Sequence, residues 1–152
     1  MKAVLPLVLW ASAAFADRPL HGSASVGGSL LATGQADGSK LRGDVEVDLE
    51  PYSRYGGLLA LRAFDKDHHG LLCGGLYYEG AAARPRLVLA LHADLGADLD
   101  VHAPLVGGGI RTTLILVGPL AIAFDSGAYL VIRGVDHSRL VLTTAAMLAL
   151  AW

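Results

Sequence analysis

Long segments in which apolar and polar residues alternate constrain the fold of this chain more than any other feature. In Lys40–Glu50, Leu41, Val45 and Leu49 lie on one side of an extended backbone, and the charged residues lie on the other. Strict period-two alternation predicts a β-strand with one apolar and one charged face. The same alternation recurs, most weakly in the first case, in Ser23–Thr33, Tyr55–Phe64, Leu72–Glu79, Arg86–Val101, Gly109–Val117, Leu120–Arg133 and Arg139–Trp152. The sequence therefore predicts an all-β fold.

The predicted strands are long, roughly 10 to 16 residues, whereas strands of globular proteins average about five or six. A tilted strand that crosses a bilayer needs about 9–11 residues, so the lengths favour a membrane protein. The connections alternate between short turns and longer loops, as in an up-and-down meander. Eight strands that close on themselves satisfy every backbone group without an edge, as lipid requires. We predict a closed antiparallel up-and-down transmembrane β-barrel of eight strands.

Two segments leave the strand count open. Residues 125–127, Asp-Ser-Gly, could form a hairpin turn, but each half of Leu120–Arg133 would then be too short to span a bilayer. We therefore predict one strand there, with Asp125 pointing inward. Val101–Gly109 is predicted to be a loop, because Pro104 and the three glycines at 107–109 disfavour a strand.

Composition agrees with a membrane protein and excludes several other classes. Hydrophobic residues make up 53% of the 152 residues and charged residues 17%, against about 25% charged residues in an average soluble domain. After Ala16, no apolar run reaches the roughly 18 residues that a transmembrane helix needs. A formal charge of −2, from 12 basic and 14 acidic residues, argues against a disordered chain and against a nucleic-acid binder.

The charged faces are predicted to point into a narrow lumen, where buried charges must be paired. Both signs are available there, and the predicted lumen charge network consists of Arg42, Glu46, Asp48, Arg62, Arg86, Asp94, Arg111, Asp125 and Arg133. Within this set, Arg62, Arg111 and Arg133 should each lie within salt-bridge reach of a carboxylate. The interior of an eight-stranded barrel is just wide enough for side chains to fill, so no large pore is expected.

The apolar faces are predicted to contact lipid. Leucine dominates them, and Tyr55, Tyr78 and Trp152 lie on them near the short turns, as in the aromatic girdle of membrane barrels. The mid-strand leucines expected near the bilayer midplane are Leu89, Leu114 and Leu148. A soluble barrel with its apolar residues inside has the same period, so the alternative is a periplasmic barrel that binds an apolar ligand.

The first sixteen residues have the layout of a secretory signal peptide. Lys2 gives a positive start, Ala3–Trp10 is apolar, and residues 14–16, Ala-Phe-Ala, match the small-x-small pattern that signal peptidase accepts. We predict cleavage after Ala16, which makes 1–16 a removed signal peptide and 17–152 the barrel domain. Cys73 is the single cysteine, so an intramolecular disulfide is excluded.

The last segment carries a family resemblance. It reads Leu140-x-Leu142-x-Thr144-x-Ala146-x-Leu148-x-Leu150-x-Trp152, with apolar residues at every second position and an aromatic residue at the end. Together with the signal peptide, it resembles the small outer-membrane β-barrel proteins of Gram-negative bacteria, of the eight-stranded OmpA and OmpX type, whose usual last residue is Phe. The resemblance implies a place in the outer membrane, contact with its lipids, and recognition of Leu148, Leu150 and Trp152 by the barrel assembly machinery. We expect a monomer.

Sites for chemistry are few. Residues 65–69, Asp-Lys-Asp-His-His, have metal-ligand side chains but are interpreted as an exposed loop tip. His137 and Ser138 invite comparison with outer-membrane lipid A deacylases, yet adjacent residues of a strand point to opposite faces. A further set is interpreted as part of a charge-paired plug rather than as a cation site: His92, His102, Asp94, Asp98 and Asp100. We therefore expect a structural or interaction role, with no enzymatic activity, cofactor, metal or nucleic acid.

Overall fold

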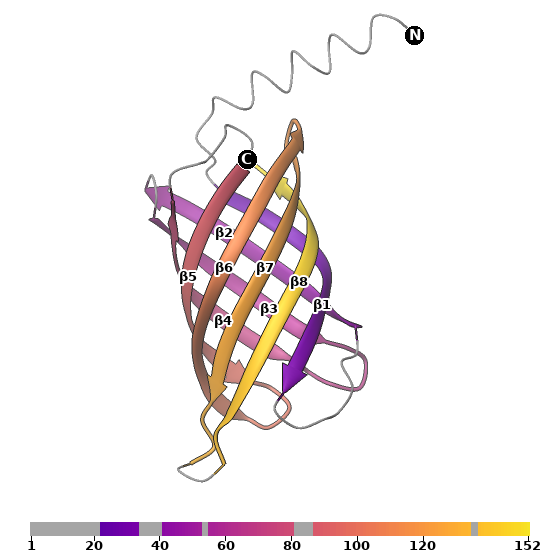
Figure 1. Cartoon of the computed structure of the whole chain (residues 1–152), viewed down its shortest axis with the longest axis vertical. Coiled ribbons are helices and arrows are strands. Elements are labelled where there is room, and N and C mark those ends of the chain that lie inside the picture. The colour runs from indigo at the N-terminus through magenta and orange to yellow at the C-terminus, as the bar shows by residue number, and fades with distance from the viewer. Residues whose placement is uncertain (1–21, 34–40, 53–54, 81–86, 135–136) are drawn as a thin grey trace, which may run out of the picture.

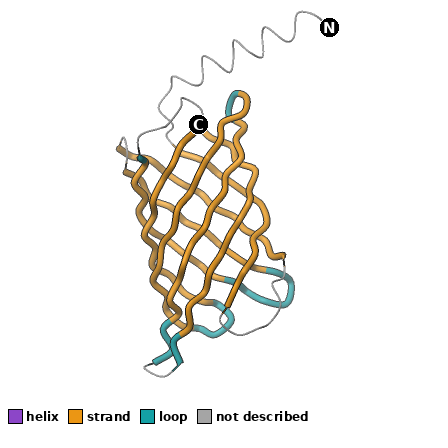
Figure 2. Tube along the Cα trace, in the orientation of Figure 1, coloured by secondary structure: helices purple, strands orange, loops and turns teal. Residues whose placement is uncertain are grey.

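Eight antiparallel strands, each hydrogen-bonded to the next, close into one barrel because the last also pairs with the first (Figures 1 and 2). The computed structural model describes residues 22–33, 41–52, 55–80, 87–134 and 137–152. The strands are β1 (Gly22–Thr33), β2 (Leu41–Tyr52), β3 (Tyr55–Phe64), β4 (Leu71–Glu79), β5 (Leu87–Asp98), β6 (Ala103–Val117), β7 (Leu120–Val131) and β8 (Arg139–Ala151). Among the described residues, no helix is long and apolar enough to cross a membrane. The predicted eight-stranded, closed, up-and-down β-barrel is confirmed.

The seam between β1 and β8 brings the two ends of the barrel wall together. The Gly22 N–H donates to the Trp152 carbonyl oxygen at 3.2 Å, and the Trp152 N–H donates to the Gly22 carbonyl oxygen at 3.0 Å. We call this side of the barrel the C-terminal end, uppermost in Figure 1. The opposite side, which carries the connections 65–70 and 99–102, is called the loop end. Since the seam is paired along its length, neither β1 nor β8 is left as an exposed sheet edge.

The strands face the way that their alternation predicts. In β8, Leu142, Leu148 and Leu150 are 46–60% exposed, whereas the intervening Met147 and Ala149 are at most 3% exposed. β7 continues without a break through Asp125, and this residue is 1% exposed. The prediction of one strand there, with Asp125 pointing inward, is confirmed. Apolar side chains thus cover the outside of the barrel, and charged ones point into it.

The predicted loop at Val101–Gly109 is wrong, because β6 already begins at Ala103. Pro104 is only the second residue of this strand, a position where a missing N–H is tolerated. The glycines mark a close approach between strands rather than a loop. A Cβ on Gly108 would lie 2.2 Å from the His92 carbonyl oxygen, and one on Gly109 would lie 2.3 Å from the carbonyl oxygen of Ser126.

One β-bulge changes the facing near the loop end. The register between β2 and β3 shifts between Gly43 and Val45, and Ala63 has a positive φ of 51°. As a result Ala63, which the alternation places on the apolar outer face, is completely buried, and its N–H donates to Asp44 Oδ1 at 2.7 Å. An extra residue in one strand turns the following side chains to the other face.

Candidate functional site

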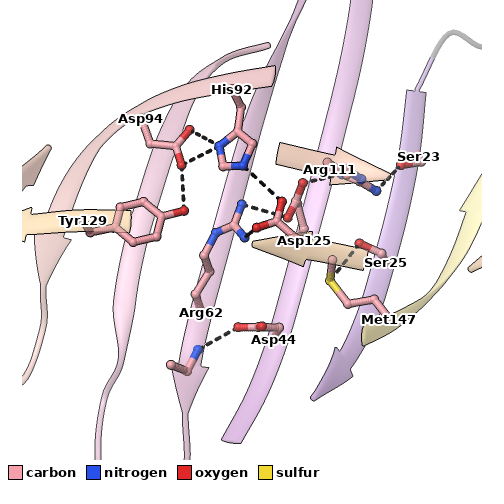
Figure 3. Close-up of polar contacts among 12 residues, drawn as sticks. Ser23, Ser25, Asp44, Arg62, His92, Asp94, Arg111, Asp125, Tyr129 and Met147 are labelled. Atoms are coloured by element: carbon pink, nitrogen blue, oxygen red, sulfur yellow. Dashed lines mark hydrogen bonds and ion pairs between the residues drawn. The ribbon is translucent and has the colours of Figure 1, made fainter. Parts of the chain in front are cut away.

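Arg62 of β3 points into the barrel and lies among acidic and aromatic side chains of other strands (Figure 3). Its Nη1 donates to Asp125 Oδ1 of β7 at 2.5 Å, and its Nη2 lies 3.0 Å from Glu46 Oε2 of β2. The guanidinium also lies 5.9 Å from the centre of the Tyr129 ring. All three charged side chains are at most 2% exposed, so each charge depends on its partners rather than on water.

His92 of β5 lies between two carboxylates (Figure 3). Its Nδ1 is 2.9 Å from Asp94 Oδ2, and its Nε2 is 3.1 Å from Asp125 Oδ2. The Tyr129 hydroxyl donates to Asp94 Oδ2 at 2.9 Å. Ionised carboxylates only accept hydrogen bonds, so this arrangement fits an imidazole ring that donates from both nitrogens and carries a positive charge.

Arg111 of β6 completes the cluster toward the C-terminal end. Its Nη1 donates to Glu46, and its Nη2 donates to Ser23 Oγ at 3.0 Å. These groups form one connected set from five strands, which we call the lumen network: Glu46, Arg62, His92, Asp94, Arg111, Asp125 and Tyr129. Removing one partner of a buried ion pair typically costs about 3–5 kcal/mol, so loss of a single charge from the network should destabilise the barrel.

The structure brings together Glu46, Arg62, Asp94, Arg111 and Asp125 of the predicted set, and Arg62 and Arg111 have the expected carboxylate partners. Arg42 lies apart, nearer the loop end, where its Nε is 3.6 Å from Asp65 Oδ2. The side chain of Asp48 and all of Arg86 lie outside the described residues.

Arg133 does not point into the barrel. It is exposed, because β7 ends at Val131 and a turn with a positive φ at Gly134 follows. The alternation of β7 therefore stops short of Arg133, and the prediction that this side chain points into the lumen is wrong.

Sequence reasoning missed two contacts of inward-facing side chains. Tyr129 was recognisable as inward only by its position in the alternation of β7, which gives no hint of its bond to Asp94. Outside the network, Arg139 at the start of β8 pairs with the buried Asp98. Neither contact joins residues that are close in the sequence, so the spacing of the residues carries no signal for it.

An apolar layer packs inside the barrel beside the lumen network, and most of its members lie toward the loop end. Its members, from β3, β4, β6, β7 and β8, are Leu58, Ala60, Leu71, Cys73, Ala103, Leu105, Tyr129, Val131 and Val141. Cys73 is completely buried in this layer, as suits a packed thiol rather than a reactive one.

A cavity of about 50 Å³ lies on the other side of the network, toward the C-terminal end. We call it the vestibule. Its lining includes Ser23, Glu46, Val88, Ala90, His92, Arg111 and Thr113. Residues at the strand ends, among them Gly22, Glu79 and Ala151, surround its mouth.

The remaining candidate residues do not assemble into a catalytic or metal site. Among the described residues, no group of three or more His, Cys, Asp or Glu side chains could hold a metal ion. The Asp67 N–H and the His68 ring hydrogen-bond the Asp65 carboxylate and hold its pKa below its ordinary value. Ser138 donates to the Gly134 carbonyl oxygen within an exposed turn, so its hydroxyl serves the turn rather than His137.

A comparison of the chain with protein-family models, with curated proteins and with solved structures finds no match.

Proposed function

We propose that this protein is a small bacterial outer-membrane β-barrel with a structural or interaction role. The observation that carries the proposal is the facing of the side chains. Fully buried carboxylates and arginines lie inside, and exposed Leu, Val and Ile side chains cover the outside on all eight strands. Soluble monomers rarely expose continuous apolar patches of more than a few hundred Å², whereas lipid requires such a surface.

The aromatic residues at the C-terminal end support the same proposal. Tyr55 and Tyr78 face outward from neighbouring strands with ring centres 5.2 Å apart, and Trp152 is also exposed at this end. Amphipathic rings are enriched where a membrane meets water. This end would then face the periplasm, in keeping with the resemblance to OmpA-type barrels.

The filled lumen favours a structural or interaction role over transport of large solutes. The lumen network and the apolar layer together occupy the interior from β2 round to β8. The same observation weighs against a soluble barrel that binds an apolar ligand, because the cavity beside the lumen network is only about 50 Å³ and a larger ligand would have to displace buried ion pairs. Losing those pairs is costly.

Cell fractionation and heat-modifiability test the proposal directly. We expect the expressed protein in the outer-membrane fraction, and we expect the detergent-extracted barrel to migrate differently in dodecyl sulfate gels before and after boiling. A closed barrel with a paired seam resists the detergent until it is heated. Recovery of the protein in the soluble periplasmic fraction would contradict the proposal.

Trp152 provides a second test, because we propose that Leu148, Leu150 and Trp152 form the assembly signal. Trp152→Asp should leave export unchanged and reduce the fraction of processed protein that resists protease in outer-membrane pellets. A carboxylate at this outward position would meet the apolar side of the interface, where charge is unfavourable. The control is Trp152→Phe, which restores the usual family residue and should behave as wild type. A wild-type level for Trp152→Asp would remove this support.

A further inference from the structure

Among the described residues, the vestibule is bordered by strand ends on one side and by the lumen network on the other. Its mouth is formed by residues at the strand ends, including Gly22 and Ala151, and its inner end is formed by Glu46, His92 and Arg111. Beyond these residues, Arg62 bridges Glu46 and Asp125, and the apolar layer follows. In the described part of the chain, the vestibule therefore ends at the lumen network and lies toward the C-terminal end of the barrel.

The charges at the inner end of the vestibule already have partners. Glu46 is held by Arg62 and Arg111, and His92 is held by Asp94 and Asp125. Glu79, near the mouth, also has an interaction of its own. An ion entering the pocket would lose its hydration without gaining an uncommitted counter-charge, which is unfavourable.

The lining of the vestibule suits an uncharged polar molecule better than an ion. The hydroxyl groups of Ser23 and Thr113 can rotate to donate or accept, and Leu58, Val88 and Ala90 supply an apolar wall. The volume of about 50 Å³ corresponds to a few water molecules, at roughly 10–15 Å³ for each. A solute of about four non-hydrogen atoms fits this space.

We propose that the vestibule is a binding site for a small uncharged solute that both donates and accepts hydrogen bonds, such as a primary amide. The solute enters from the C-terminal end and stops at the lumen network.

Thiol accessibility tests the proposal on the full mature barrel folded in detergent. In a Cys73→Ala background, Thr113→Cys places a thiol in the vestibule wall. Thr143→Cys is the matched control, because Thr143 is also an inward, buried threonine but does not line the vestibule. Ser138→Cys, in the exposed turn, calibrates each reagent, and Ala90→Cys repeats the vestibule measurement on β5. Heat-modifiability confirms that each variant is folded.

For each reagent, the rate at Thr113→Cys is divided by the rate at Ser138→Cys. This ratio should be at least about tenfold higher for the neutral methyl methanethiosulfonate than for its charged trimethylammonium-ethyl and sulfonato-ethyl analogues. The charged reagents must lose their hydration to enter the vestibule. Thr143→Cys should stay unmodified. Acetamide should slow the modification of Ala90→Cys, which keeps the hydroxyls of Ser23 and Thr113, in a saturable way, whereas acetate, which has the same shape and a charge, should not. Equal rates at Thr113→Cys and Thr143→Cys, protection by acetate, or no effect of acetamide would each overturn the proposal.

Discussion

Replacing Arg62 with Met should lower the free energy of unfolding by about 3–5 kcal/mol. The reason is that Glu46 and Asp125 would lose the guanidinium that now lies 3.0 Å and 2.5 Å from their oxygens, in a place with almost no access to water. The measurement is reversible urea unfolding of the barrel folded in detergent or vesicles.

The same substitution at Arg133 is the matched control. Arg133 is exposed beyond the end of β7, so Arg133→Met should change the free energy of unfolding by no more than about 0.5 kcal/mol. Adding Asp125→Asn to Arg62→Met should recover part of the loss, because one of the two stranded carboxylates is then neutral. Equal losses for Arg62→Met and Arg133→Met would contradict the central place of Arg62.

Replacing Leu91 with Arg should cost about 2–4 kcal/mol in lipid vesicles, the penalty for a charge at the bilayer midplane. Leu91 points outward near the middle of β5, opposite Ile110 of β6. Val88, three residues away on the same strand, lines the vestibule near Glu46. Val88→Arg should therefore cost much less, since its charge can reach water at the mouth. Folding free energies in vesicles of both variants give the comparison.

The two variants also separate the membrane barrel from a soluble one. In a soluble barrel Leu91→Arg would place a charge in water and cost almost nothing, while Val88→Arg would disturb the interior. A larger loss for Val88→Arg than for Leu91→Arg would therefore contradict an outer surface that faces lipid.

Alternation in the sequence was enough to predict the direction of most side chains. It placed Asp125 inward and Leu148 outward, because the two faces of a strand follow from parity alone. Parity does not give depth along the barrel axis. Leu114, predicted near the midplane, pairs with Leu87 at the very start of β5 and so lies near the C-terminal end.

The misplaced depth of Leu114 and the missed start of β6 have one cause. Glycines at 107–109 resemble a loop in the sequence, but here they let neighbouring strands approach closely. The sequence also could not predict which carboxylates pair with Arg62. Which carboxylate meets which arginine across a barrel depends on the stagger between strands, a property of the closed sheet rather than of any segment.

The lumen network has a consequence for how the barrel forms. Arg62 meets Glu46 on the adjacent β2, but it meets Asp125 only when β7 has come round to the other side. His92 on β5, by contrast, meets Asp94 on its own strand and Asp125 on β7, so its contacts lie within the last four strands. A sheet of the first four strands would carry Arg62 with Glu46 alone, and a sheet of the last four would hold Asp125 beside His92 but without Arg62. Closure thus satisfies the charges of both halves in a single event, so partly closed intermediates are penalised and folding becomes cooperative across the whole circumference.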